Sequence, residues 1–193
     1  MANFLEAYAI TRDHEGGYTF DPDDVGGETY KGIARRYSKS WTGWVIIDGY
    51  KSNSNFPAIL YEDKELNAKV TKFFKDRYWD VNLLDEFPSQ NIANEMFDTG
   101  VNMGVDRAAK FLQIALNVLN KKGTIYSDIV VDGKIGPATL RALNACINYR
   151  GEVYLYKVLN ILQGYHYIEY MQKSETQEKF AYGWLNRVDF IKK

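Results

Sequence analysis

The chain has 193 residues, enough to bury a sizeable core either as one domain or as two small lobes that share an interface. Its 24 basic and 25 acidic residues nearly cancel, which disfavours binding to nucleic acid or to an anionic membrane surface. No apolar run approaches the roughly 20 residues of a membrane span, and the N-terminus lacks a basic segment followed by an apolar one. We therefore expect a globular protein, made in the cytoplasm without a signal peptide and without membrane insertion.

Apolar residues recur at helical spacing through most of the chain, which predicts a mainly α fold. In the first helix, Phe4, Leu5, Tyr8 and Ala9 form the apolar face, and the helix ends close to Glu15, before two glycines. Strand-like segments follow between residues 18 and 33, and a further one is predicted at 44–47. Later helices are predicted at 66–79, 89–104, 108–119, 137–146, 155–165 and 180–191, where the inward positions of the last two include Tyr165, Val188 and Ile191. The single cysteine, Cys146, lies within such a helix and is expected in the core.

The segment from residue 12 to residue 37 is rich in carboxylates and glycines. A carboxyl group in the last turn of a helix meets the negative end of the helix dipole, and if it also faces a hydrophobic wall, both effects disfavour its charged form. Glu15 would then stay protonated near neutral pH, as a general acid requires. The following "DPDDVGGET" contains two turn signals between short β-prone pieces and predicts a small hairpin whose loop carries Asp21, Asp23 and Asp24.

Two carboxylates that face one bond are the minimum apparatus for cleaving a glycoside. Glu15 and Asp24 are the natural pair, and Thr29 on the second arm of the hairpin could position a water or a sugar hydroxyl. Two other interpretations remain open. The aspartates could be solvated turn-formers, or they could bind calcium, although the ordered ligand run of a calcium loop is missing.

Several segments resemble glycoside hydrolase family 108, a family of N-acetylmuramidases of which some are called secretion activator proteins. "HEGGY" and "DDVGGETYKGI" resemble the N-terminal signature of this family, and "YWD", "FDTGVNMG" and "LQIALNVL" resemble its middle segments. "VVDGKIGPATLRAL" and "KFAYGWLNRV" resemble the predicted peptidoglycan-binding region that usually follows. The resemblance covers nearly the whole chain, and the ordered blocks make it specific.

This resemblance implies a lysozyme-like helical bundle with a small β-hairpin beside an active-site cleft. The implied activity is that of a muramidase, which cleaves the β-1,4 bond between N-acetylmuramic acid and N-acetylglucosamine in peptidoglycan without a metal or cofactor. Glu15 matches the proposed acid of the family. The order Glu15, Asp24, Thr29 is similar to that of phage-type lysozymes, with the last gap one residue shorter. A lytic transglycosylase and a non-catalytic wall-binding or secretion-helper module are the alternatives.

The resemblance also implies a division of labour along the chain. Residues 1–101 are expected to form the catalytic lobe and residues 102–193 a helical peptidoglycan-binding lobe, packed together as one compact, monomeric unit. Without a signal peptide, the enzyme would reach the cell wall by release, as an endolysin of a prophage does behind a holin or as the cargo of a secretion apparatus does. The candidate substrate-binding residues are Gly17, Tyr18, Gly27, Tyr30 and Asn102. The tyrosines, like Trp41 and Trp44, could stack on sugar rings or lie in the core, and Asn102 could bind a sugar or cap its helix.

Overall fold

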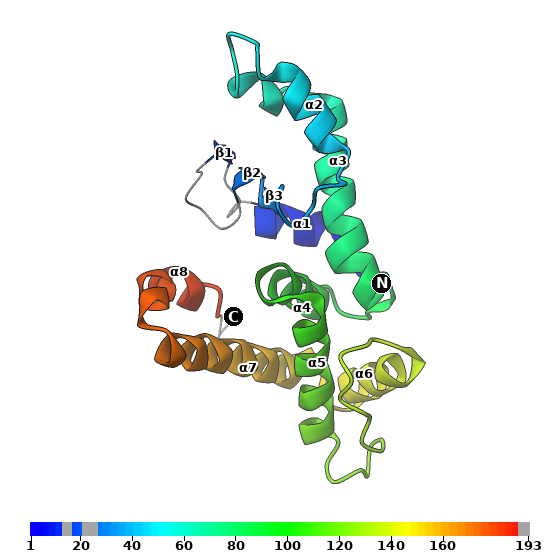
Figure 1. The fold of residues 1–193 in the computed structure, drawn as a ribbon. Helices are drawn as coiled ribbons and strands as arrows, with labels where there is room; N and C mark the ends of the chain where they lie inside the picture. The colour runs from blue at the N-terminus through cyan, green and yellow to red at the C-terminus, as the bar shows by residue number, and fades with distance from the viewer. Residues whose placement is uncertain (13–16, 21–26, 189–193) are drawn as a thin grey trace. The chain divides into compact units, whose positions relative to one another are not determined.

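The computed structural model describes residues 1–12, 17–20 and 27–188. Two compact units divide the chain: a small unit, Tyr8–Arg77, and a large unit that combines Met1–Ala7 with Tyr78–Lys193. Helices make up most of both units, and a three-stranded antiparallel sheet lies in the small unit (Figure 1). The predicted class, mainly α with a small β element, is confirmed.

The sheet of the small unit has the order β1 (Tyr18–Phe20), β2 (Glu28–Tyr30), β3 (Ile33–Ala34). It contains the predicted hairpin and one further short strand. Between β2 and β3, Lys31 and Gly32 both have positive φ values, 45° and 77°, as a tight two-residue hairpin turn requires. Because this turn reverses the chain within two residues, the residues that follow it pair with β2 and form the third strand.

The helices of the small unit pack around one another. The predicted strand at 44–47 is wrong, because these residues belong to a helix in which Trp44 and Ile47 are buried one turn apart. A short apolar run cannot by itself distinguish a strand from a buried helix segment. Asp63 begins the next helix by accepting a hydrogen bond from the backbone N–H of Leu66 at 2.7 Å. The elements are α2 (Gly43–Tyr50), η1 (Ala58–Tyr61) and α3 (Lys64–Phe74), with α3 continued by a π-helical turn, η2 (Lys75–Trp79).

The large unit is a helical bundle in which α4, α5 and α7 pack against one another, while α6 covers α5 and α7. Ser89 caps α4 through the N–H of Ile92, and Pro137 occupies the first turn of α6, where its missing N–H costs nothing. Gly104 and Gly151 separate consecutive helices with positive φ values. The elements are η3 (Asp80–Asn82), η4 (Leu84–Glu86), α4 (Gln90–Met103), α5 (Val105–Leu119), α6 (Pro137–Arg150), α7 (Glu152–Lys173), η5 (Glu175–Phe180) and α8 (Ala181–Leu185).

The first helix, α1 (Phe4–Arg12), forms as predicted but presents a different face to the interior. Phe4, Ala7 and Tyr8 are buried, whereas Leu5 is 62% exposed and Ala9 is exposed too. Phe4, Ala7 and Tyr8 follow the i, i+3, i+4 spacing of one helix face, which leaves Leu5 and Ala9 on the side turned to solvent.

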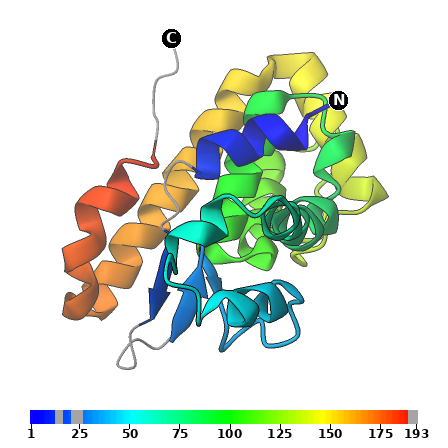
Figure 2. The same ribbon diagram turned by 90° about the horizontal axis from the view of Figure 1, so that it is seen from above.

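The C-terminal segment also differs from the prediction. Of the helix expected at 180–191, the described residues contain only the short helix α8, which follows the 3₁₀ helix η5 and runs beside the C-terminal half of α7 (Figures 1 and 2). Tyr165 of α7 is 63% exposed and does not face inward. Val188 does approach α7, because a Cβ atom added at Gly164 would lie 3.3 Å from its Cγ1. Ile191 lies outside the described residues.

An aromatic cluster forms part of the core of the large unit. Trp79 is fully buried, and its ring lies 5.7 Å from that of Phe4 and 6.0 Å from that of Phe97, both in edge-on contacts. Its indole N–H donates to Asp85 at 2.8 Å, so the polar atom of this ring is also satisfied. The cluster joins the start of the chain to the helices that follow residue 78.

We predict that Trp79→Ala lowers the free energy of unfolding by about 3–5 kcal/mol, because it removes buried aromatic surface and leaves a cavity. Urea unfolding followed by circular dichroism measures this loss. Val118→Ala is the control, since Val118 is 65% exposed and its truncation should cost less than about 0.5 kcal/mol. Similar losses for the two variants would contradict a core role for Trp79.

Candidate active site

The two carboxylates predicted to act on the substrate, Glu15 and Asp24, lie outside the described residues, as does His14. Their places in the sequence are nevertheless bounded by described elements. Glu15 falls between the end of α1 at Arg12 and the start of β1 at Tyr18, and Asp24 falls between β1 and β2. The geometry around the candidate site therefore comes from the residues of the sheet and from the side chains that hold it.

Contacts at the start of β1 fix the chain just after the Glu15 segment. The carbonyl of Gly17 accepts a hydrogen bond from the N–H of Lys31 at 3.2 Å, and the ring of Tyr18 meets Phe56 edge-on at 4.7 Å. A Cβ atom added at Gly17 would lie 1.7 Å from the hydroxyl oxygen of Tyr61. Glycine at position 17 thus permits the close approach of Tyr61, while the predicted role of Gly17 in substrate binding stays a prediction.

Tyr30 does not present a ring to a sugar. Its side chain has no exposed surface, and its hydroxyl donates to the carbonyl of Leu60 at 3.1 Å. Burial raises the pKa of Tyr30 to about 12. Beside it, Tyr61 is 49% exposed, and the ammonium group of Lys31 lies 5.5 Å from the centre of the Tyr30 ring and 5.7 Å from that of Tyr61. Tyr61 is thus an exposed aromatic ring of this region, as is Phe20 of β1 at 65%, and no sequence motif had singled out either ring.

Five of the predicted site residues come together on or beside the sheet: Gly17, Tyr18, Gly27, Thr29 and Tyr30. Thr29 is the central residue of β2 and is paired with strands on both sides. Its hydroxyl contacts the carbonyl of Gly27 at 3.5 Å, at the long limit of a hydrogen bond, so it remains available to another partner.

The remaining candidates lie elsewhere in the fold. Asn102 is exposed near the end of α4 in the large unit, where its side-chain amide donates to the carbonyl of Asp98, four residues earlier, at 2.8 Å. In the small unit, Trp44 is buried and Trp41 packs edge-on against it at 5.2 Å, which is the core role foreseen for most aromatics.

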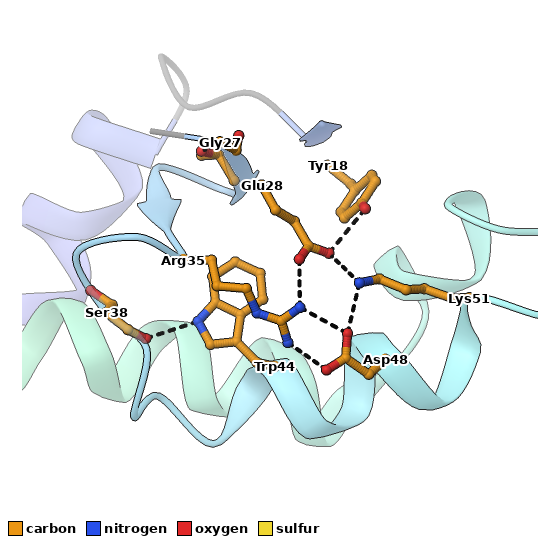
Figure 3. Close-up of polar contacts among 9 residues, drawn as sticks. Tyr18, Gly27, Glu28, Arg35, Ser38, Trp44, Asp48 and Lys51 are labelled. Carbon is orange, nitrogen blue, oxygen red and sulfur yellow. Dashed lines mark hydrogen bonds and ion pairs between the residues drawn. The ribbon is translucent and has the colours of Figure 1, made fainter. Parts of the chain in front are cut away.

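A network of charged side chains connects the sheet to α2 (Figure 3). We call it the Glu28 cluster; it consists of Tyr18, Glu28, Arg35, Asp48 and Lys51. Glu28 is only 7% exposed and accepts from the Tyr18 hydroxyl at 3.0 Å, from Arg35 at 2.5 Å and from Lys51 at 2.8 Å. Arg35 also binds Asp48 through two N–H groups, at 2.9 and 2.5 Å. Three donors thus converge on the Glu28 carboxylate, which accepts all of these hydrogen bonds.

The charges of the cluster balance and stabilise one another. The hydrogen bond from Arg35 and then that from Lys51 lower the pKa of Asp48 to about 2, while the bond to Asp48 raises the pKa of Arg35. Burial by itself would lower the pKa of Lys51, but its bonds to Asp48 and Glu28 outweigh this effect and raise it. The Arg35 guanidinium also lies 4.7 Å from the centre of the Trp44 ring, which holds it in place.

The described residues contain no group of three or more histidine, cysteine or acidic side chains that could hold a metal ion. Cys146 is free and fully buried, and burial raises the pKa of its thiol, so it is the core residue that its spacing predicted. No helix in the described ranges is long and apolar enough to span a membrane.

A mainly α fold with a small antiparallel sheet is consistent with a lysozyme-like fold. The chain belongs to the family described as glycosyl hydrolase 108, whose model matches residues 8–104. A second model, the predicted peptidoglycan domain, matches residues 107–189, and peptidoglycan is thereby indicated as the substrate partner.

The fold is also similar to a solved structure titled "Structure of Brucella abortus SagA". The comparison has a TM-score of 0.61 and 24% sequence identity, and it covers 96% of this chain and 88% of that one. This similarity extends through both units and shows a shared fold. A search of curated proteins finds no match.

We predict that Asp48 contributes to the acid stability of the small unit. A carboxyl whose pKa is lower in the folded state stabilises the protein above its unfolded pKa of about 4, and this contribution is lost as the pH falls toward about 2. Asp48 is 48% exposed, so Asp48→Asn should cost no more than about 1 kcal/mol at pH 7.

Thermal unfolding between pH 7 and pH 2 measures this effect. The melting temperatures of Asp48→Asn and the wild type should converge as the pH falls from 4 to 2. Asp106→Asn, which removes an exposed carboxylate paired with Lys110 in the large unit, controls for the loss of one negative charge. A constant difference between Asp48→Asn and the wild type across this range would contradict the prediction.

Proposed function

We propose that this protein is an N-acetylmuramidase that hydrolyses the β-1,4 bond between N-acetylmuramic acid and N-acetylglucosamine, with Glu15 as the general acid. The observation that carries the proposal is the family match over residues 8–104, a range that includes Glu15, Asp24 and the whole sheet. In the sequence, Glu15 lies between Arg12, the last described residue of α1, and the first strand. A helix end disfavours the charged form of a carboxyl group and so favours a proton donor.

The proposed reaction needs two groups with different tasks. Glu15 donates its proton to the glycosidic oxygen as the bond to the sugar breaks. Asp24 either orients the attacking water or stabilises the positive charge that develops on the sugar ring. Thr29 supports this role, because its hydroxyl makes one long contact and can still bind a water or a sugar hydroxyl.

The Glu28 cluster limits the choice of the second carboxylate. The Glu28 carboxylate is occupied by three donors, and Asp48 is bound by Arg35 and Lys51. Most acceptor sites of both carboxylates are thus taken up by protein donors, which makes either one a poorer choice for orienting a water. This favours a carboxylate from the loop between β1 and β2, and Asp24 is our choice within it.

We further propose that the catalytic lobe spans residues 1–101 and that residues 102–193 bind peptidoglycan. The second range contains the whole match to the predicted peptidoglycan domain. In this proposal the protein acts as a monomer on the cell wall after synthesis in the cytoplasm, and a holin or a secretion apparatus releases it.

We predict that Glu15→Gln loses about 10²–10⁴-fold in the rate of peptidoglycan hydrolysis, because glutamine cannot donate the required proton. Purified peptidoglycan is digested with each variant, and the products are identified by mass spectrometry. The wild type should release fragments with reducing N-acetylmuramic ends. Glu6→Gln is the matched control, since Glu6 is an exposed carboxylate on α1 and its replacement should leave the rate unchanged.

Other products would point to the alternatives. Anhydro-muramic ends would identify a lytic transglycosylase. If the wild type released nothing but still bound peptidoglycan, the protein would be a wall-binding module and the proposal would fail. Equal rates for Glu15→Gln and the wild type would remove Glu15 from the mechanism, whatever the products.

A further inference from the structure

The large unit contains a hollow of about 290 Å³, and none of its lining residues belongs to the sheet. It is formed by the end of α4, the first turn of α5, the C-terminal half of α7, and α8; the latter two run side by side in Figure 2. Polar groups and aromatic rings both line it: Asn102, Met103, Arg107, His166, Tyr167, Tyr170 and Trp184. All of these come from residues 102–193.

The polar side of the hollow is formed by Arg107, whose guanidinium group is bound by His166. Arg107 donates from Nη1 to Nε2 of His166 at 2.5 Å. Burial and the nearby guanidinium lower the pKa of His166, so the ring is neutral near pH 7 and accepts this bond. The bond uses one edge of the guanidinium and leaves its other N–H groups available.

Arg107 is exposed, and no carboxylate of the described residues lies within ion-pair distance of it. The neighbouring acids are paired with other cations: Asp106 binds Lys110 at 2.7 Å, and Glu169 binds Lys173 at 2.9 Å. A planar guanidinium that is fixed on one edge and open on the other is suited to a two-point contact with a carboxylate.

The other side of the hollow is an aromatic wall. The ring of Trp184 is stacked on that of Tyr167 at 5.2 Å and 16°, and Phe180 stacks against Trp184 at 5.6 Å and 29°. Tyr170 is 46% exposed and lies 6.4 Å from the His166 ring in a stacked arrangement. Rings that hold one another offer a rigid apolar surface at little entropic cost.

We propose that this hollow binds a free carboxylate of the peptide stems of peptidoglycan, with Arg107 as the anion contact and the aromatic rings against the adjoining peptide or sugar. This inference rests on the proposed peptidoglycan substrate and specifies which part of it is recognised. The lactyl carboxyl group of muramic acid is consumed in the amide bond to the peptide, so the free carboxylates of a stem-bearing strand are on the peptide. The site therefore distinguishes peptidoglycan from uncharged glycans.

The test uses N-acetylmuramyl-L-alanyl-γ-D-glutamyl-L-lysyl-D-alanyl-D-alanine, whose carboxylates on D-glutamate and on the terminal D-alanine are also free in a peptidoglycan stem, and the same compound with both carboxylates converted to amides. Neither contains the bond that a muramidase cleaves, so binding is measured without turnover, by calorimetry and by NMR of the Trp184 indole. The wild type should bind the acid at least about tenfold more tightly than the amide. Arg107→Gln should remove this preference. Arg141→Gln, which removes an exposed arginine of α6 outside the hollow, should keep it.

Three results would overturn the inference. They are equal affinity of the wild type for acid and amide, an unchanged preference in folded Arg107→Gln, and displacement of the acid by acetate at a matched concentration, which would assign the site to small carboxylates in general. The digestion experiment is independent of this one. If the protein hydrolyses peptidoglycan but shows no carboxylate preference, the enzyme proposal stands and the binding site is wrong. If it shows a preference that is lost in Arg107→Gln but does not hydrolyse peptidoglycan, the binding site stands and the enzyme proposal is wrong.

Discussion

The ion pairs of the Glu28 carboxylate are the constraint on which the small unit depends. A buried charge is tolerated only when it is paired and hydrogen-bonded, and here the donors come from β1, from the segment after β3, and from Lys51 at the end of α2. Removing either of the cations, Arg35 or Lys51, would leave the charges of the cluster unbalanced in a poorly solvated place. The strands that flank the proposed acid and its partner are thus held by electrostatics more than by an extended core, since β1 and β2 have only three residues each.

The large unit is stabilised in a different way. Its helices bury continuous apolar faces, and Trp79 and Phe97 have no exposed surface. Polar pairs connect its C-terminal segment to this core, as Arg187 binds Asp98 at 2.6 Å and Gln163 of α7 donates to Thr99 at 3.2 Å. A rigid bundle of this kind keeps the rings and the guanidinium of the surface hollow in fixed positions, which a binding site needs and a loop cannot provide.

A protein with almost no net charge can still recognise an anionic substrate if a single cation is suitably placed. A net charge of −1 gives no global attraction for a polyanion. Recognition of a single carboxylate does not require such a field, because one guanidinium in a partly enclosed hollow interacts more strongly than the same group in open water. In the proposed enzyme, glycan cleavage therefore depends on a proton donor near the sheet, and substrate selection depends on a local cation in the C-terminal region.

The sequence by itself determined the fold class, most helices and the family, because apolar spacing, helix caps such as Ser89 and the glycine-containing signature are all local in the chain. It also chose residues that gather on one sheet, although Glu15 and Asp24 remain predictions. Tertiary structure decided what depends on distant partners: the burial of Tyr30 beneath the Leu60 carbonyl, the helical form of residues 44–47, the Glu28 cluster, and the bond between Arg107 and His166, 59 residues apart. Local patterns carry no information on such pairings, because burial and charge compensation are fixed only when separate segments pack together.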